Sequence, residues 1–148
     1  MSNIIEVRKI SQQYAYSSLQ LHEAVSKKAG FSGTDHKYLG FFIQKGSLTA
    51  GELADLTGLS TGAVTGLIDR FEKKKLVKRS FDKNDRRKVV VVANTNKIIA
   101  LLEPFYAEFQ HETEKLLASY TENEIETIAS FLEKSIELIK NTTKSITK

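Results

Sequence analysis

Two helix-start signals on either side of a single glycine constrain this chain more than any other feature of its sequence. Thr49 and Glu52 have the spacing of a capping box, in which a hydroxyl and a carboxylate reciprocally satisfy free amides at a helix start. Gly58 then ends the first helix, and Ser60 caps a second one. Apolar residues recur in this second helix at the spacing of one buried stripe, at Val64, Leu67, Ile68 and Phe71. Two short helices joined by a tight glycine turn form a helix-turn-helix.

The hydrophobic period changes directly after the second of these helices. Residues 76–81 and 89–92 are rich in β-branched and apolar side chains, and the charged segment 82–88 separates them. This pattern predicts a β-hairpin with a charged tip, which beside a helix-turn-helix is called a wing.

Helical periodicity precedes the helix-turn-helix. Apolar residues recur at helical spacing over residues 4–29, which predicts one long helix. A short helix is expected over residues 37–44, with Thr34 or Asp35 as its cap.

Helical periodicity also returns after the wing. Asn94 or Thr95 can cap a long helix that reaches Leu116, in which Pro104 requires a kink unless it lies near the first turns. Residues 121–124 form a second capping box, from which a last helix begins. The fold class is therefore mostly α with a small β-hairpin wing, a winged helix-turn-helix flanked by long terminal helices.

Positive charge is concentrated in one third of the chain. The formal net charge is +4, but residues 60–90 hold 10 basic and 4 acidic residues, a balance of +6. Residues 1–59 hold 6 and 5, and residues 91–148 hold 6 and 9. A concentrated basic block is expected of an element that binds a polyanion, although a solvated lysine face has the same composition.

Several classes of function are excluded by what the sequence lacks. It has no cysteine, so it offers no disulfide, thiolate metal site or thiol chemistry. It has no phosphate-cradling glycine loop and no nucleophile elbow, so we expect neither an enzyme nor a cofactor. His22, His36 and His111 are far apart and lack the spacing of metal ligands. No segment has the length of a signal peptide core or a membrane span, which predicts a cytoplasmic protein.

The run from Leu48 to Arg79, followed by Asp85-Arg86-Arg87, closely resembles the MarR family of bacterial transcriptional regulators. Lys75 stands where that family often has glycine, and residues 93–94 depart from its usual Leu-Thr. The resemblance implies a homodimer whose terminal helices intertwine and whose winged helix-turn-helix reads a pseudo-palindromic operator in double-stranded DNA. It also implies a repressor that a small aromatic or anionic effector releases from DNA.

These expectations divide a single domain, residues 1–148, into functional parts. Residues 31–93 are expected to form the DNA-binding lobe, and residues 1–30 and 94–148 the helical dimerisation region. The apolar stripe of the last helix exceeds what a small winged helix covers, so we expect it to bury against a second copy. The predicted dimer residues are Ile125, Ile128, Leu132, Ile136 and Ile139. Packing within one chain is the alternative.

The predicted DNA-binding residues are the polar and basic groups of the second helix of the motif and of the wing. They are Ser60, Thr61, Gly62, Thr65, Gly66, Arg70, Lys73, Lys83, Arg86 and Arg87. Two glycines inside a helix cost about 1 kcal/mol each, which indicates a close approach to DNA or, alternatively, to another helix. Arg70 is a candidate for guanine or phosphate, unless it only pairs with Asp69 or Glu72.

The wing tip is expected to straddle phosphates and to insert one arginine into the minor groove. Asp85 would orient the guanidinium of Arg87 by a charge-assisted hydrogen bond, as the family pattern implies. Whether Arg86 or Arg87 enters the groove stays open at this point. A hairpin tip that only keeps the protein soluble is the alternative, but it leaves the nearby Lys73, Lys74, Lys78 and Arg79 unexplained.

Two further hypotheses concern other partners. Regulators of the resembled family often bind effectors between the dimer helices and the DNA-binding lobe, and here the candidate lining is Tyr14, His36, Phe41 and Phe105. The alternative is that these aromatic residues belong to the core. A winged helix can also serve as a protein-interaction module, and the basic block argues against that function.

Overall fold

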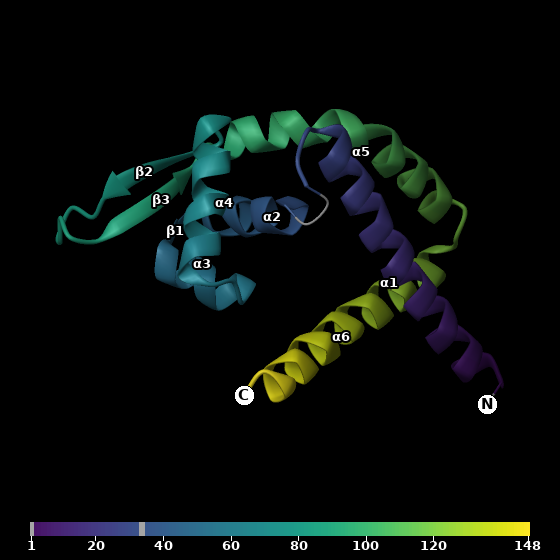
Figure 1. Ribbon diagram of the computed structural model, residues 1–148. Coiled ribbons are helices and arrows are strands. Elements are labelled where there is room, and N and C mark those ends of the chain that lie inside the picture. The colour runs from purple at the N-terminus through teal and green to yellow at the C-terminus, as the bar shows by residue number, and fades with distance from the viewer. Residues whose placement is uncertain (1, 33–34) are drawn as a thin grey trace. The chain divides into compact units, whose positions relative to one another are not determined.

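A computed structural model describes residues 2–32 and 35–148. In chain order its elements are α1 (Ser2–Lys28), α2 (Asp35–Lys45), β1 (Ser47–Thr49), α3 (Ala50–Thr57), α4 (Thr61–Lys73), β2 (Val77–Phe81), β3 (Val89–Ala93), α5 (Thr95–Ala118) and α6 (Glu122–Ile146). The predicted fold class is confirmed, because helices flank a helix-turn-helix and a small sheet forms the wing (Figure 1).

The helix-turn-helix of α3 and α4 forms as its capping signals predict. Gly58 closes α3 with φ of +70°, and its N–H donates to the carbonyl of Ala54. Ser60 caps α4 by accepting a hydrogen bond from the N–H of Ala63 at 3.3 Å. A left-handed residue that is not glycine carries a steric penalty, so glycine suits this turn.

The capping box at Thr49 is only half formed. The Thr49 hydroxyl accepts from the N–H of Glu52 at 3.1 Å, as predicted, but it also donates to the Glu52 carboxylate at 3.1 Å. The carboxylate is thus bonded to the hydroxyl rather than to a free amide. Thr49 is also the last residue of β1, where it lies opposite Val90 of β3.

The sheet has three strands in the order β1-β3-β2, where the sequence predicted a hairpin of two. The hairpin itself is antiparallel, with Val77 opposite Ala93 and Phe81 opposite Val89. β1 adds the third strand by pairing Leu48 with Val91. A strand of three residues is too short to show a hydrophobic alternation, so this pairing could be seen only in the fold.

The core of the DNA-binding lobe is built around the buried stripe of α4. Phe71 packs edge-on against Phe31 and Phe42, with ring centroids 5.8 and 6.2 Å away. Buried residues from the surrounding segments complete this core, among them Leu39, Leu48, Leu53, Leu76, Val91 and Ile98. Burying this stripe holds the opposite face of α4 at the surface.

The helices α2, α5 and α6 begin at or next to the capping residues that the sequence predicted. Asp35 is the first residue of α2, while Thr34 lies outside the described residues. Asn94 caps α5 by accepting from the N–H of Lys97 at 3.1 Å. The capping box of α6 is complete, with both Thr121 and Glu124 bonded to each other's amides.

The chain divides into two compact units, Met1–Phe105 and Tyr106–Lys148. The division falls inside α5 between Phe105 and Tyr106, one residue beyond Pro104, which lies within the helix. A proline there removes one helical hydrogen bond, so the position is a weak point of α5. The first unit contains the helix-turn-helix and wing, and the second contains α6, in which no residue is buried.

Candidate nucleic-acid interface

The outer face of α4 carries the small and polar residues that the sequence predicted there. Thr61, Gly62 and Thr65 are exposed, and Gly66 is half-buried. A Cβ atom added at Gly62 would meet nothing within 4 Å, and one at Gly66 would meet only Nη1 of Arg70, at 3.8 Å. Within the described residues, helix packing therefore does not account for these glycines. They leave a part of the helix surface without projecting side chains.

Arg70 extends from the same face but is bonded to a residue that the sequence did not indicate. Its Nη2 atom lies 3.2 Å from Oδ1 of Asp35, at the start of α2. The predicted alternative, a pair with Asp69 or Glu72, is not what forms. The Arg70 side chain is still 53% exposed, so its remaining N–H groups can reach a ligand.

Asp69 and Glu72 instead bind Arg79 of β2. Nη1 of Arg79 lies 2.7 Å from Glu72, and Nη2 lies 2.6 Å from Asp69. The backbone N–H of Arg79 donates to Glu72 at 3.0 Å, and this bond is the main reason that the pKa of Glu72 lies below its usual value. The hydrogen bond to Asp69 is the main reason that the pKa of Arg79 is raised.

Lys74 also has partners within the lobe, although the residue is exposed. Its ammonium lies 4.5 Å from the ring centroid of Phe31 and donates to the carbonyl of Gly30 at 3.1 Å. Its own carbonyl accepts a hydrogen bond from Lys97 of α5. Of the four residues that the sequence grouped beside the wing, Lys74 and Arg79 thus have partners inside the lobe. Lys73 and Lys78 are exposed.

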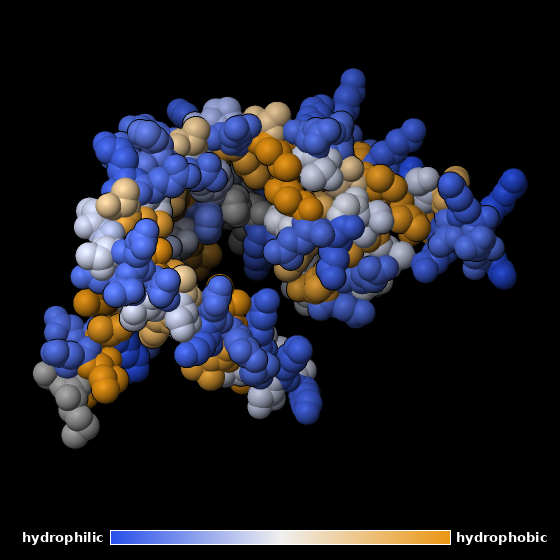
Figure 2. Space-filling view, turned by 180° about the vertical axis from the view of Figure 1, so that it is seen from behind, coloured by the Kyte–Doolittle hydropathy of each residue, from blue (hydrophilic) through white to orange (hydrophobic). Residues whose placement is uncertain are grey.

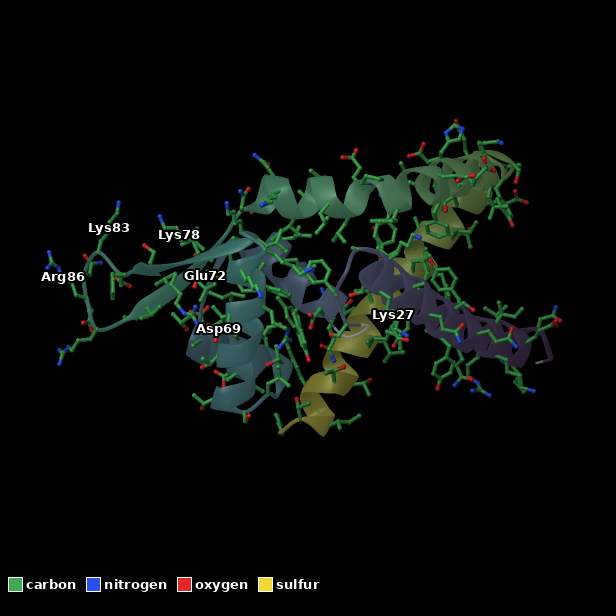
Figure 3. All side chains as sticks on the ribbon, turned by 45° about the horizontal axis from the view of Figure 1, so that its top comes forward. Lys27, Asp69, Glu72, Lys78, Lys83 and Arg86 are labelled. Atoms are coloured by element: carbon green, nitrogen blue, oxygen red, sulfur yellow. The ribbon has the colours of Figure 1, made fainter. Side chains whose placement is uncertain are left out.

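The wing tip is compact, exposed and rich in positive charge. Asp82 and Lys88 close it by a backbone hydrogen bond of 2.9 Å. Figure 3 shows Lys83 and Arg86 at this end of the wing, pointing away from α4. In the space-filling view the wing ends in hydrophilic residues (Figure 2).

Asp85 accepts a hydrogen bond from the backbone of Arg87 and forms an ion pair with its guanidinium, where the wing motif implied a hydrogen bond to the guanidinium itself. Oδ1 of Asp85 accepts from the N–H of Arg87 at 3.0 Å, and Nε of Arg87 lies 3.5 Å from the same oxygen. The Arg87 side chain is 95% exposed. Its direction is therefore biased by Asp85, while the guanidinium stays accessible to a partner.

The four residues predicted for an effector pocket have different surroundings. Tyr14 is exposed, Phe41 and Phe105 are half-buried, and the side chain of His36 lies outside the described residues. A pocket of about 490 Å³ is instead found where the end of α1, the end of α4 and the start of α5 approach one another. Its lining consists of Ala29, Phe31, Lys74, Leu76, Lys97, Ala100 and Leu101.

The predicted dimer residues all lie along α6. Ile125 and Ile128 are half-buried, whereas Leu132, Ile136 and Ile139 are exposed. Large apolar side chains are also exposed on α1, among them Ile4, Ile10 and Leu19. Among the described residues, no cluster of histidine, aspartate and glutamate could hold a metal ion. No helix over residues 2–32 and 35–148 is both long and apolar enough to cross a membrane.

The sequence also has close relatives among known proteins. The model of the MarR family matches residues 29–88. The HTH-type transcriptional regulator YcgE of Bacillus subtilis, itself uncharacterised, is 41% identical over 122 residues, which are 80% of this chain and 77% of that protein. The chain belongs to the MarR family. It is thus a transcriptional regulator and not an enzyme.

Solved structures of MarR proteins share this fold. A MarR family protein from Bacillus stearothermophilus is 22% identical and has a TM-score of 0.72, covering 93% of this chain and 96% of that one. A mutant MarR from E. coli complexed with operator DNA is 21% identical with a TM-score of 0.57, covering 90% and 95%. In this MarR chain α4 is the second helix of the helix-turn-helix, the position that is called the recognition helix in DNA-binding proteins with this motif, and the β2–β3 hairpin forms the wing.

Proposed function

We propose that this MarR-family regulator is a sequence-specific repressor that binds double-stranded DNA as a homodimer and recognises a pseudo-palindromic operator. The open outer face of α4 carries this proposal, because Thr61, Gly62 and Thr65 have no protein neighbour that covers them. A helix with a low polar face fits the major groove of B-DNA. Such a regulator acts in the cytoplasm, where the DNA of a bacterial cell lies.

The recognition helix is assigned two kinds of contact. Ser60, Thr61 and Thr65 would meet base edges, thymine methyl groups or phosphates, with Gly62 and Gly66 allowing the backbone to approach. Arg70 and Lys73 would bind phosphate or guanine from the last turns. The open space above Gly62 and the half-exposed guanidinium of Arg70 support these roles.

The wing is assigned the flanking contacts. Lys83 and Arg86 would bind phosphates, and Arg87, oriented by Asp85, would enter the minor groove. We choose Arg87 over Arg86 because Asp85 restrains its backbone and its Nε atom together. A guanidinium that is restrained before binding loses less conformational entropy on entering a narrow groove.

The homodimer is assigned to the terminal helices. α6 buries none of its residues, although Leu132, Ile136 and Ile139 lie along it. Isolated helices are marginal in water unless an apolar face packs against a partner. A second copy that covers this face would also place two recognition helices on the two halves of a pseudo-palindrome.

The effector is assigned to the pocket of about 490 Å³ beside α4. This pocket replaces the predicted lining of Tyr14, His36, Phe41 and Phe105. Lys74 and Lys97 lie among apolar lining residues there, so a small aromatic acid suits the pocket. Such an anion would compete for the Lys74 ammonium that now bonds Gly30. We propose that this change, at the end of the recognition helix, releases DNA.

Selection of bound sites from a random pool of duplex DNA tests the function. The expected product is an inverted repeat with half-sites one helical turn apart, bound more tightly than random duplex by a factor of about a thousand or more. Thr65→Ala is the test variant, and Thr142→Ala, on α6, is the matched control that should bind like the parent. If no sequence is enriched, the proposed function is wrong and a protein-interaction module becomes the better hypothesis.

A further inference from the structure

Three hydrogen bonds fasten Arg79, on β2, to the recognition helix. Its two terminal nitrogens bind Glu72 and Asp69, at 2.7 and 2.6 Å. Its backbone N–H binds the second carboxylate oxygen of Glu72 at 3.0 Å. Hydrogen bonds that use both arms of a guanidinium fix the plane of the group as well as its position. We call these three residues the ionic link.

The ionic link joins the two parts of the protein that are proposed to contact DNA. β2 is an edge strand, so its outward N–H groups have no neighbouring strand, and that of Arg79 is satisfied by α4 instead. Figure 3 shows Asp69 and Glu72 on α4 beside the base of the wing, while Lys83 and Arg86 lie at its far end. The link therefore acts at the place where a small tilt would displace the tip most.

We propose that Arg79 is a positioning residue, which with Asp69 and Glu72 sets the wing at the distance from the recognition helix at which both contact one duplex. This inference rests on the proposed DNA-binding function and gives Arg79 a role that its charge does not suggest. An arginine in a basic wing is expected to bind phosphate. Here both arms bind carboxylates, which would otherwise repel DNA from α4.

Neutralising the two carboxylates distinguishes a positioning role of the ionic link from a simple effect of charge, because the two predict opposite changes in DNA affinity. Asp69→Asn combined with Glu72→Gln removes two negative charges near the DNA, so charge alone predicts tighter binding. If the ionic link positions the wing, this variant binds the selected site about tenfold more weakly than the parent. Its affinity for random duplex should stay the same or rise. Tighter binding to the selected site would overturn the inference.

A mutant cycle shows whether the three residues act together. Arg79→Gln should also weaken specific binding about tenfold. The triple variant should bind the selected site no more weakly than Arg79→Gln or the double variant, because all three lose the same cooperative unit. Additive losses, with a salt slope lower by about one unit for Arg79→Gln, would mean that Arg79 binds phosphate and would refute the inference.

Lys78→Gln is the matched control for loss of charge. Lys78 is the neighbouring residue of β2, is exposed, and has no ion-pair partner among the described residues. Its loss should weaken binding of selected and random duplex alike. Every variant should keep the helical circular dichroism and melting temperature of a folded protein before its affinity is interpreted.

Hydrogen exchange tests the ionic link without DNA. Asp69→Asn removes one contact of the Arg79 guanidinium and leaves Glu72 in place. If the three residues form a cooperative unit, the hydrogen bond from the Arg79 backbone N–H to Glu72 should weaken as well. Exchange of this N–H should accelerate about fivefold, while amides of α3 keep their rates. Unchanged exchange of the Arg79 amide would contradict the link. A parent protein that selects no DNA sequence would instead refute the proposed function and would leave the exchange result intact.

Discussion

Asp35 and Arg70 meet at 3.2 Å although they lie 35 positions apart in the sequence. The Asp35 side chain is only 3% exposed, so a carboxylate is buried at the start of α2 and its countercharge comes from the recognition helix. One arginine thus fastens α4 to α2 while the rest of its guanidinium faces solvent. The residue proposed to bind DNA also stabilises the lobe.

Replacing Arg70 with alanine should therefore lower stability. The substitution removes the ion-pair partner of the buried carboxylate, and we expect the free energy of unfolding to fall by about 2 kcal/mol. This figure lies below that for a fully buried pair because solvent reaches Arg70. Urea unfolding measures the change. Adding Asp35→Asn should recover about half of the loss, and a fully stable Arg70→Ala protein would contradict this account.

Replacing Lys75 with glycine should raise stability. Lys75 has φ of +61°, a left-handed conformation that costs a residue with a Cβ atom about 1–2 kcal/mol. Glycine removes this strain, so the expected gain is roughly 0.5–1 kcal/mol after its greater flexibility when unfolded is counted.

Gly58→Ala is the control for Lys75→Gly and should have the opposite sign. Gly58 has φ of +70°, and a Cβ atom there would meet nothing within 4 Å, so only backbone strain is introduced. Thermal unfolding of both variants measures the difference. Equal melting temperatures for the parent and Lys75→Gly would mean that the strain at this position is relieved in another way.

Replacing Arg87 with alanine should reduce the dependence of DNA binding on salt. Each basic contact that is lost, in the minor groove or at a phosphate, releases fewer counterions and lowers the slope of log affinity against log salt by about one unit. Fluorescence anisotropy on the selected site, at several salt concentrations, measures this slope. Arg86→Ala and Lys140→Ala, on α6, are the comparisons. An unchanged slope for Arg87→Ala would remove that residue from the interface.

Replacing Ile136 with lysine should break the homodimer. The Ile136 side chain is exposed in the single chain, so the substitution disturbs no core within it. In a dimer the new ammonium would be buried among apolar residues without a partner, which costs several kcal/mol. Sedimentation equilibrium at micromolar concentration should show a monomer for Ile136→Lys and a dimer for Lys140→Ala. A dimer in both cases would place the interface elsewhere.

Stability should also depend on pH through Glu72. Its folded pKa lies below 4.5 because the Arg79 N–H and guanidinium favour the carboxylate over the acid. A lowered folded pKa means that this stabilisation is present above the unfolded value of 4.5 and is lost as pH falls through the folded value.

Comparison with Glu72→Gln isolates this contribution. Between about pH 6 and about pH 3.5 the melting temperature of the parent should fall more than that of Glu72→Gln, which has no carboxyl to protonate at that site. Parallel curves for the two proteins would mean that the ionic link adds no stability at neutral pH.

The sequence by itself determined the helices, their ends and the wing. Gly58, Ser60 and Asn94 act on amides within a few positions of themselves, so their effects can be read from neighbouring residues. The buried stripe of α4 follows from helical spacing alone, and it predicted which face would stay exposed.

Only the tertiary structure decided how the basic residues are used. Charge composition cannot separate Arg79 and Lys74, which are bonded to groups of the lobe, from Lys83 and Arg87 at the tip. The same holds for β1, whose pairing with β3 has no local signal. These partners come from other elements of the fold, which lie 7 to 44 positions away in the chain. A side chain's bonding is set by what folding brings within about 3 Å of it.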